Sequence, residues 1–200
     1  MIKLGVLGSG RGSNFQAIYK NILNGTLKAE VVVVISNKES KMLKIAEEYG
    51  LISVFLDPKG FTSKEEYDAE LVNILKKHGV DLVVLAGYMK ILTPVFINAF
   101  PAKILNIHPS LLPSFKGLHP QQQALDAGVK FSGCTVHFVT IELDSGPIII
   151  QEVVPVLPND NEDTLAERIL EKEHVLYTEA IKIVARGTLP IAPAQEGEGT

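Results

Sequence analysis

The chain has 200 residues, a formal net charge of -4 and 46% hydrophobic residues, which suffices for a full hydrophobic core in one domain. The mildly acidic balance lacks a basic block and does not favour nucleic-acid binding, and no apolar run is long enough to span a bilayer. One cysteine excludes a disulfide framework and a cysteine-based metal site within one chain, and it indicates a reducing compartment, the cytoplasm.

Strand and helix patterns alternate through the first half of the chain. The first residues enter an apolar run directly, so we expect no signal peptide. Apolar, β-branched runs predict strands over residues 2–7, 31–35, 52–56, 80–86 and 102–108. Apolar residues at helical spacing predict helices over residues 15–23, 42–49, 63–78 and 94–99, with Ser63 and Glu66 in a capping-box pattern. This order predicts a parallel sheet with helices on both faces.

Different patterns follow in the second half. Helices are expected over residues 118–128 and 162–186, and an Asp-Ser-Gly turn between strands 132–140 and 147–156 predicts an antiparallel pair. The fold class is therefore α/β, doubly wound, with a mostly parallel sheet and a C-terminal antiparallel strand pair. We expect one domain over residues 1–188 and a flexible tail over 189–200, which is rich in Pro, Gly and Glu.

A glycine-rich loop follows the first strand. Gly8, Gly10 and Gly12 miss the dinucleotide-binding spacing by one residue, and the second strand ends in Ser-Asn where that motif needs an acidic residue. The loop can instead present backbone N–H groups, with Ser13 and Asn14, to a single phosphate at a helix N-terminus. The alternative is a tight strand-to-helix turn capped by Ser13.

The stretch 106–113, Asn-Ile-His-Pro-Ser-Leu-Leu-Pro, ends the fifth expected strand. Because side chains alternate along a strand, Asn106 and His108 lie on one face, where an amide and an imidazole can stabilise one oxyanion. Asp144 in the downstream turn can favour the imidazolium and relay a proton. The alternatives are a core histidine beside a turn asparagine, and an ordinary turn aspartate.

These motifs, taken together, resemble the folate-dependent formyltransferases. The matching segments run from the first strand to the last helix: residues 12–14, 85–92, 106–113, 117–119, 133–139, 143–147 and 173–174. The resemblance implies a Rossmann-like formyltransferase fold and a cis bond between Leu112 and Pro113. It also implies an enzyme that transfers the formyl group of 10-formyltetrahydrofolate, a co-substrate, to the amine of glycinamide ribonucleotide in purine biosynthesis.

The same resemblance implies three sets of site residues. The catalytic residues would be Asn106, His108 and Asp144. The ribonucleotide would be bound by Gly12, Ser13, Asn14 and Glu173. Folate would be bound by Lys64, Met89, Lys90, Ile91, Leu92, Asn106, Thr140, Ile141, Glu142, Leu143 and Asp144. The lysines keep the charge of the arginines that some relatives carry but lose their bidentate geometry.

Several further expectations concern partners and rival functions. We expect small-molecule substrates, no nucleic acid, no membrane and a monomer or weak homodimer. His108, His119 and His137 lack metal-ligand spacing, so no metal is expected, and His137 is assigned a structural or supporting role. The rival functions are a methionyl-tRNA formyltransferase, a formyltetrahydrofolate hydrolase and a folate- or nucleotide-binding module without catalysis. The first two should carry an additional domain.

Overall fold

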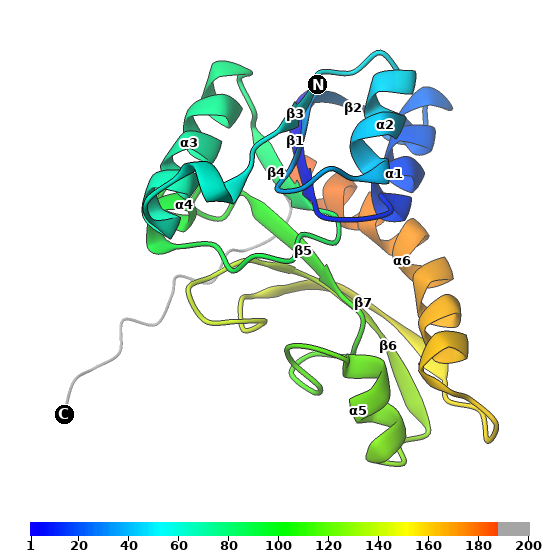
Figure 1. The fold of residues 1–200 in the computed structure, drawn as a ribbon. Coiled ribbons are helices and arrows are strands. Elements are labelled where there is room, and N and C mark those ends of the chain that lie inside the picture. The colour runs from blue at the N-terminus through cyan, green and yellow to red at the C-terminus, as the bar shows by residue number, and fades with distance from the viewer. Residues whose placement is uncertain (188–200) are drawn as a thin grey trace.

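A computed structural model describes residues 1–187 of the chain, which form a seven-stranded sheet between two layers of helices (Figure 1). The predicted tail, residues 189–200, lies outside the described residues. The strands are β1 (Ile2–Gly8), β2 (Ala29–Ser36), β3 (Ser53–Phe55), β4 (Leu82–Leu85), β5 (Ile104–His108), β6 (Phe131–Phe138) and β7 (Ile148–Pro155). The helices are α1 (Ser13–Leu23), α2 (Lys41–Glu48), α3 (Lys64–Lys77), α4 (Pro94–Ala99), α5 (Pro120–Asp126) and α6 (Glu162–Ala185), with a 3-10 turn over Pro58–Gly60.

The sheet has the order β3-β2-β1-β4-β5-β6-β7. Strands β1 to β5 pair in parallel, whereas β6 runs antiparallel to both β5 and β7. The predicted fold class is confirmed, including the antiparallel β6–β7 pair. Because β1 lies between β2 and β4, the chain winds outward from β1 in both directions, and the loops after β1 and β4 meet at the carboxyl edge of the sheet.

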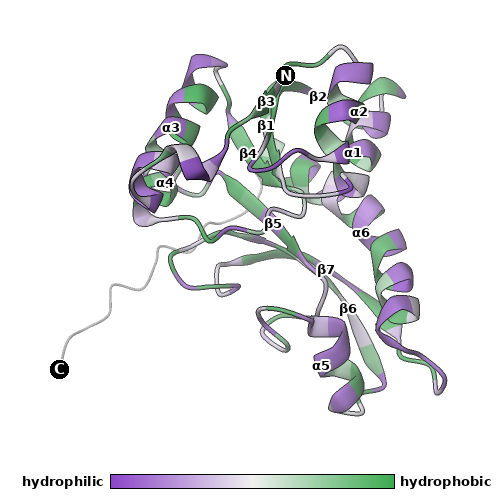
Figure 2. Ribbon diagram, viewed as in Figure 1, coloured by the Kyte–Doolittle hydropathy of each residue, from purple (hydrophilic) through white to green (hydrophobic). Residues whose placement is uncertain are grey.

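Two hydrophobic cores hold the layers together. One core joins α1, α2 and α6 to one face of the sheet, and its largest members include Phe15, Met42 and Tyr177. The other joins α3 and α4 to the opposite face around Tyr67 and Phe96. Figure 2 shows the apolar strands in the middle and hydrophilic residues on the outer sides of the helices. This burial of both sheet faces explains why the parallel strands read as continuous apolar runs.

Element ends agree with the sequence expectations to within two residues. The predicted helix 118–128 is shorter, because His119 has a left-handed backbone (φ 53°) and Pro120 begins α5. The expected cap of α3 is present. The Ser63 hydroxyl accepts the Glu66 N–H at 3.0 Å, and the Glu66 carboxylate reaches back to accept from the Thr62 N–H at 3.0 Å and from the Ser63 N–H. Among residues 1–187, no helix has the length and apolarity that a membrane crossing needs.

Candidate active site

Strand β5 delivers Asn106 and His108 to the carboxyl edge of the sheet. It lies between β4 and β6, so its backbone is hydrogen-bonded on both sides. The buried Tyr177 hydroxyl of α6 lies 2.9 Å from the carbonyl oxygens of both Leu85 and Leu105, to which it donates. The end of β4 and the start of β5 are therefore bonded to the same helix, and Leu105 directly precedes Asn106 of the motif.

The turn between β6 and β7 brings Asp144 to the same place. Asp144 has a left-handed backbone (φ 48°), a conformation that aspartate tolerates better than most residues. Two residues later, a Cβ on Gly146 would lie 1.9 Å from the Phe138 carbonyl oxygen, so only glycine fits this close approach. The turn thus directs the Asp144 side chain inward, where only 7% of it is exposed.

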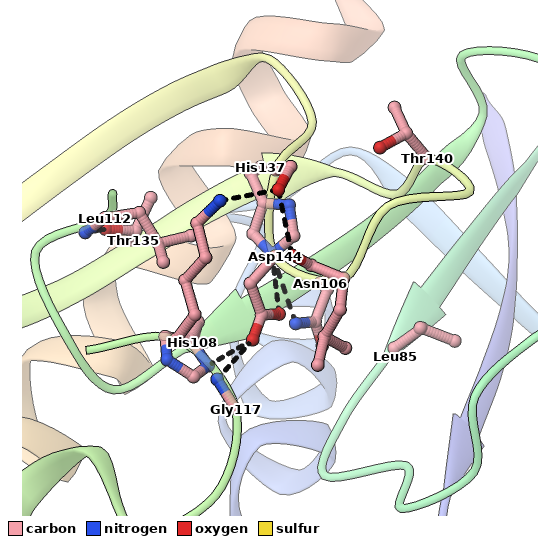
Figure 3. A network of polar contacts seen from close by, with 12 residues as sticks. Leu85, Asn106, His108, Leu112, Gly117, Thr135, His137, Thr140 and Asp144 are labelled. Atoms are coloured by element: carbon pink, nitrogen blue, oxygen red, sulfur yellow. Dashed lines mark hydrogen bonds and ion pairs between the residues drawn. The ribbon is translucent and has the colours of Figure 1, made fainter. Parts of the chain in front are cut away.

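The loop after β5 closes over the Asp144 carboxylate. The Gly117 N–H donates to Asp144 Oδ2 at 3.0 Å (Figure 3). The loop is held from below by Thr135 of β6, whose hydroxyl donates to the Ser110 carbonyl at 2.7 Å and accepts from the Leu112 N–H at 3.1 Å. The peptide bond from Leu112 to Pro113 is cis, which confirms the expectation from the family resemblance. The segments after β5 and after β6 therefore meet across the carboxylate.

His108 lies between two hydrogen-bond acceptors. Its Nε2 donates to the Phe115 carbonyl at 2.8 Å, and its Nδ1 lies 3.5 Å from Asp144 Oδ2. A carbonyl can only accept, so the proton on Nε2 is assigned from this network. Each ring nitrogen of His108 therefore faces an oxygen atom: the Phe115 carbonyl at Nε2 and the Asp144 carboxylate at Nδ1.

His137 contacts Asn106 directly, which agrees with the supporting role expected for it and identifies a partner that the sequence did not indicate. Its Nδ1–H donates to the Phe138 carbonyl at 2.9 Å, which leaves Nε2 unprotonated to accept from Asn106 Nδ2 at 3.2 Å. Burial lowers the pKa of His137 and favours this neutral form. Its Nε2 also lies 3.7 Å from Asp144 Oδ1. Strand alternation places His137 on the same face as Thr135. It does not indicate Asn106 as the partner of His137, because that contact arises from the register that pairs β5 with β6.

The glycine loop forms the opposite side of the site. Gly12 caps α1 with a left-handed backbone (φ 75°), and a Cβ there would lie 2.8 Å from the Met42 Cβ. Ser13 is the first helical residue and not the cap, so the capped-turn alternative is wrong in that detail. The N-terminal N–H groups of α1 and the Ser13 side chain therefore remain at the helix start for an anion.

Asn14 and Glu173 meet behind this loop. The Asn14 Nδ2 donates to Glu173 Oε2 at 2.8 Å. Burial raises the pKa of Glu173, and the hydrogen bond from Asn14 lowers it by less. The Asn14 Oδ1 is buried without a hydrogen-bond partner among the described residues. A buried acceptor of this kind costs free energy unless a ligand donates to it, so the pair suits polar ligand groups.

The predicted folate residues lie on loops beside the catalytic cluster. Large apolar side chains are exposed there by 54–72%: Met89, Ile91, Ile141 and Leu143. Exposed apolar side chains gathered at a site favour an apolar ligand surface. Leu92 differs, because its side chain is buried in the core with α3 and α4. Thr140 donates to the Glu142 carbonyl at 3.2 Å and so stiffens the turn that carries Asp144.

Lys64 and Lys90 lie apart from the catalytic cluster. Both line a cavity of about 200 Å³, together with Tyr67, and none of the three catalytic candidates lines it. The Lys90 ammonium lies 5.4 Å from the centre of the Tyr67 ring, in cation–π geometry. Two ammonium groups beside one cavity suit carboxylates. Among residues 1–187, no cluster of His, Cys, Asp or Glu side chains is arranged to hold a metal ion.

The comparison with protein families matches residues 2–181 of this chain to the formyl transferase model. The chain belongs to the formyl transferase family. This confirms the resemblance that the motifs indicated. The match spans all seven strands and most of α6, so the polar cluster and the glycine loop both lie inside the formyl transferase region.

Similar proteins agree with this family assignment. The chain is 44% identical to phosphoribosylglycinamide formyltransferase of Escherichia coli over 185 residues, covering 92% of this chain and 87% of that protein. It is 46% identical to the trifunctional purine biosynthetic protein adenosine-3 of Drosophila melanogaster, of which it spans only 14%. A crystal structure of glycinamide ribonucleotide transformylase 1 from Symbiobacterium toebii matches with a TM-score of 0.95 and 48% identity, covering 96% of this chain and 92% of that one.

Proposed function

We propose that this formyl transferase moves the formyl group of 10-formyltetrahydrofolate to the amine of glycinamide ribonucleotide. The products are tetrahydrofolate and formylglycinamide ribonucleotide. The observation that carries the proposal is the cluster of the half-buried Asn106 with the buried His108 and Asp144 at the carboxyl edge of the sheet, the edge at which α1 starts and the exposed apolar loops lie. The names of relatives of matched length support the same acceptor.

The ribonucleotide side is built from the loop after β1. The N-terminal N–H groups of α1, with Gly12, Ser13 and Asn14, bind the phosphate because the helix start offers unpaired donors and a positive dipole end. Glu173 and the unpaired Asn14 Oδ1 accept from the ribose or amide groups of the same substrate. The acceptor amine is thereby directed toward Asp144.

The folate side is built from the loops after β4 and β6. Met89, Ile91, Ile141 and Leu143 cover the flat ring system, and their exposure in the free protein supplies the apolar surface that the ring needs. Lys64 and Lys90 attract the carboxylates of the folate tail. Leu92 contributes through its backbone, because its side chain packs into the core.

The catalytic residues stabilise charge at the formyl carbon. When the amine attacks, negative charge develops on the formyl oxygen. One hydrogen of Asn106 Nδ2 is used by His137, and the other donates to this oxygen. The His108 Nε2–H is the second donor, once it exchanges the Phe115 carbonyl for the formyl oxygen. Loss of one such donor typically lowers the rate about 100- to 1,000-fold.

Asp144 moves the proton. The Gly117 N–H and His108 hold Oδ2, so Oδ1 faces the reacting groups. The carboxylate accepts a proton from the attacking amine and returns it, directly or through water, to the folate nitrogen that leaves. The buried Cys134 takes no part, because burial raises the pKa of its thiol to about 12.

An absorbance assay of folate deformylation tests the proposal. Deformylation of 10-formyltetrahydrofolate that requires glycinamide ribonucleotide and yields its formylated product is the expected result. Deformylation without an acceptor would instead assign the hydrolase function. Binding of folate without any turnover would assign a binding module. We further propose a cytoplasmic location and a monomer or weak homodimer, which sedimentation of the purified protein will test.

A further inference from the structure

Ser9 lies where the two substrate loops meet. It directly follows β1, and the neighbouring strand ends belong to β2 and β4 (Figure 1). The helix after β1 and the helices on either side of β4 cover opposite faces of the sheet, so the direction in which the chain winds reverses at this point. Ser9 is only 1% exposed there.

Three hydrogen bonds connect Ser9 to both neighbouring loops. Its hydroxyl accepts from the Met89 N–H at 2.9 Å and donates to Asn37 Oδ1 at 2.6 Å. Its own backbone N–H donates to the Gly87 carbonyl at 3.0 Å. One buried hydroxyl therefore joins the loop after β1 to the loops after β2 and β4.

At Met89 the backbone is held by a hydrogen bond, whereas the side chain is exposed to solvent. The Met89 N–H is held by Ser9, whereas 72% of the residue remains exposed on the folate side. The same loop is tied at its far end, where the Thr93 N–H donates to the buried Asp68 carboxylate at 2.6 Å. The backbone of residues 87–93 is thus fixed at two points, while the Met89 and Ile91 side chains are exposed. Among residues 1–187, the bond to the Ser9 hydroxyl is the only side-chain hydrogen bond between this loop and the glycine loop.

We propose that Ser9 is a positioning residue that sets the distance between the ribonucleotide loop and the folate loop. This inference rests on the proposed function, because it assigns one substrate to each loop. The reacting carbon and amine are held by opposite loops, and a displacement of about 1 Å between reacting groups can lower a rate about 100-fold. The Ser9 hydroxyl adds a side-chain bond to the backbone bond between Ser9 and Gly87, and so limits that displacement.

Ser9→Ala and Ser36→Ala form a matched pair for the test. Ser36 is also buried at a strand end of the same sheet edge, but its hydroxyl donates to the Lys38 carbonyl at 2.7 Å, within its own turn. Both variants remove one buried hydroxyl. Only the first removes the partner of Met89. Asn37→Ala is a milder third variant, because it removes the acceptor of the Ser9 hydroxyl and keeps the bond to Met89.

Steady-state kinetics should separate the pair. For Ser9→Ala we expect kcat to fall about tenfold and KM for the formyl folate to rise about tenfold, since both depend on loop spacing. Ser36→Ala should leave both within about twofold of the wild type, at a similar shift in Tm, and Asn37→Ala should fall between the two. Equal kinetics in the two serine variants would overturn the proposal.

Hydrogen exchange gives a second readout that does not depend on turnover. The Met89 amide should be protected in the wild type and in Ser36→Ala, and it should exchange at least about tenfold faster in Ser9→Ala. If residues 87–92 of Ser9→Ala kept the protection of the wild type, the proposal that the Ser9 hydroxyl holds this loop would be refuted, even if the variant were a slow enzyme. A wild type that exchanges as expected but transfers no formyl group would instead contradict the proposed function alone.

Discussion

The loops after β1 and after β5 lie at the same edge of one sheet, yet they offer a ligand different groups. The loop after β1 offers backbone N–H groups, and two of its glycines, Gly8 and Gly12, pack against Met42 too closely to carry side chains. The loop after β5 offers the side chains of Asn106 and His108, which are bonded to partners from β6 and the turn beyond it. This difference indicates that the first region binds and the second performs the chemistry. Substitutions should therefore change KM on one side and kcat on the other.

The largest expected effect is at Asp144. Asp144→Asn keeps the shape of the side chain and an acceptor for the Gly117 N–H, but it removes the proton acceptor. We expect kcat to fall by about 100- to 10,000-fold, the usual range for a lost general base. Asp126→Asn at the end of α5 is the matched control and should remain active. A kcat within tenfold of the wild type would exclude Asp144 from proton transfer.

His137 should give the next largest effect. His137→Phe keeps an aromatic ring but removes the acceptor that orients the Asn106 amide, so we expect kcat to fall about 10- to 100-fold. His78→Phe, at the end of α3, serves as the control. If Asn106 needed no orientation, the two variants would have similar kcat values.

The same histidine predicts a pH dependence. Burial lowers its pKa in the folded protein, whereas the unfolded chain titrates near the ordinary value of about 6.5. Between these two pKa values the unfolded state binds more protons, so the free energy of unfolding should fall as the pH drops through this window. His137→Phe should lose that part of the dependence. Thermal unfolding from pH 7.5 downward will measure it, and identical curves for both proteins would contradict the assignment.

Substitution of Glu173 tests the region that is proposed to bind the ribonucleotide. Burial raises the pKa of Glu173 in the folded protein. The contribution of Glu173 to the free energy of unfolding is therefore present below the pKa of the unfolded chain, and it is lost as the pH rises through the pKa of the folded protein. Glu173→Gln should therefore raise Tm at pH 7.5 and give little gain below pH 4. It should also raise KM for the ribonucleotide about tenfold, because a hydrogen bond to a charged group is lost. Glu171→Gln, its exposed neighbour, should change neither quantity.

The smallest effect is expected at Met89. Because 72% of the residue is exposed, Met89→Ala should change the free energy of unfolding by less than about 0.5 kcal/mol. KM for the formyl folate should rise about threefold through lost apolar contact. Leu23→Ala, at an equally exposed position on α1, is the control. A change in kcat larger than the change in KM would place Met89 among the residues that support the chemistry.

Sequence periodicity predicted the parallel half of the fold almost completely. The buried strands are continuous apolar runs with glycine and asparagine at their ends, so β1 to β5 could be located within a few residues. The antiparallel pairing of β6 with β5 was not foreseen, because no turn signal joins strands that are separated by 22 residues. Asp-Ser-Gly indicated only the pairing of β6 with β7.

Some site residues could be predicted from local sequence patterns, and others could not, because their contacts join distant parts of the chain. Asn106 and His108 share one strand, so their common face follows from alternation alone. The roles of Asp144 and Glu173 depended on the family resemblance, because a turn aspartate and a helix glutamate are common. The partner of His137 and the role of Ser9 were not foreseen, since their contacts depend on strand register and on the position of a neighbouring loop. Such contacts are set by tertiary packing, which local sequence patterns do not carry.

Calorimetric titration of glycinamide ribonucleotide into Asp144→Asn tests the division between binding and chemistry most directly. We predict a Kd within about threefold of the wild type, beside a kcat that is at least about 100-fold lower. That result would assign Asp144 to the chemistry and leave binding to the loop after β1 and to Glu173. A Kd that weakens in proportion to the loss of kcat would contradict the account, because the two regions would then act as one.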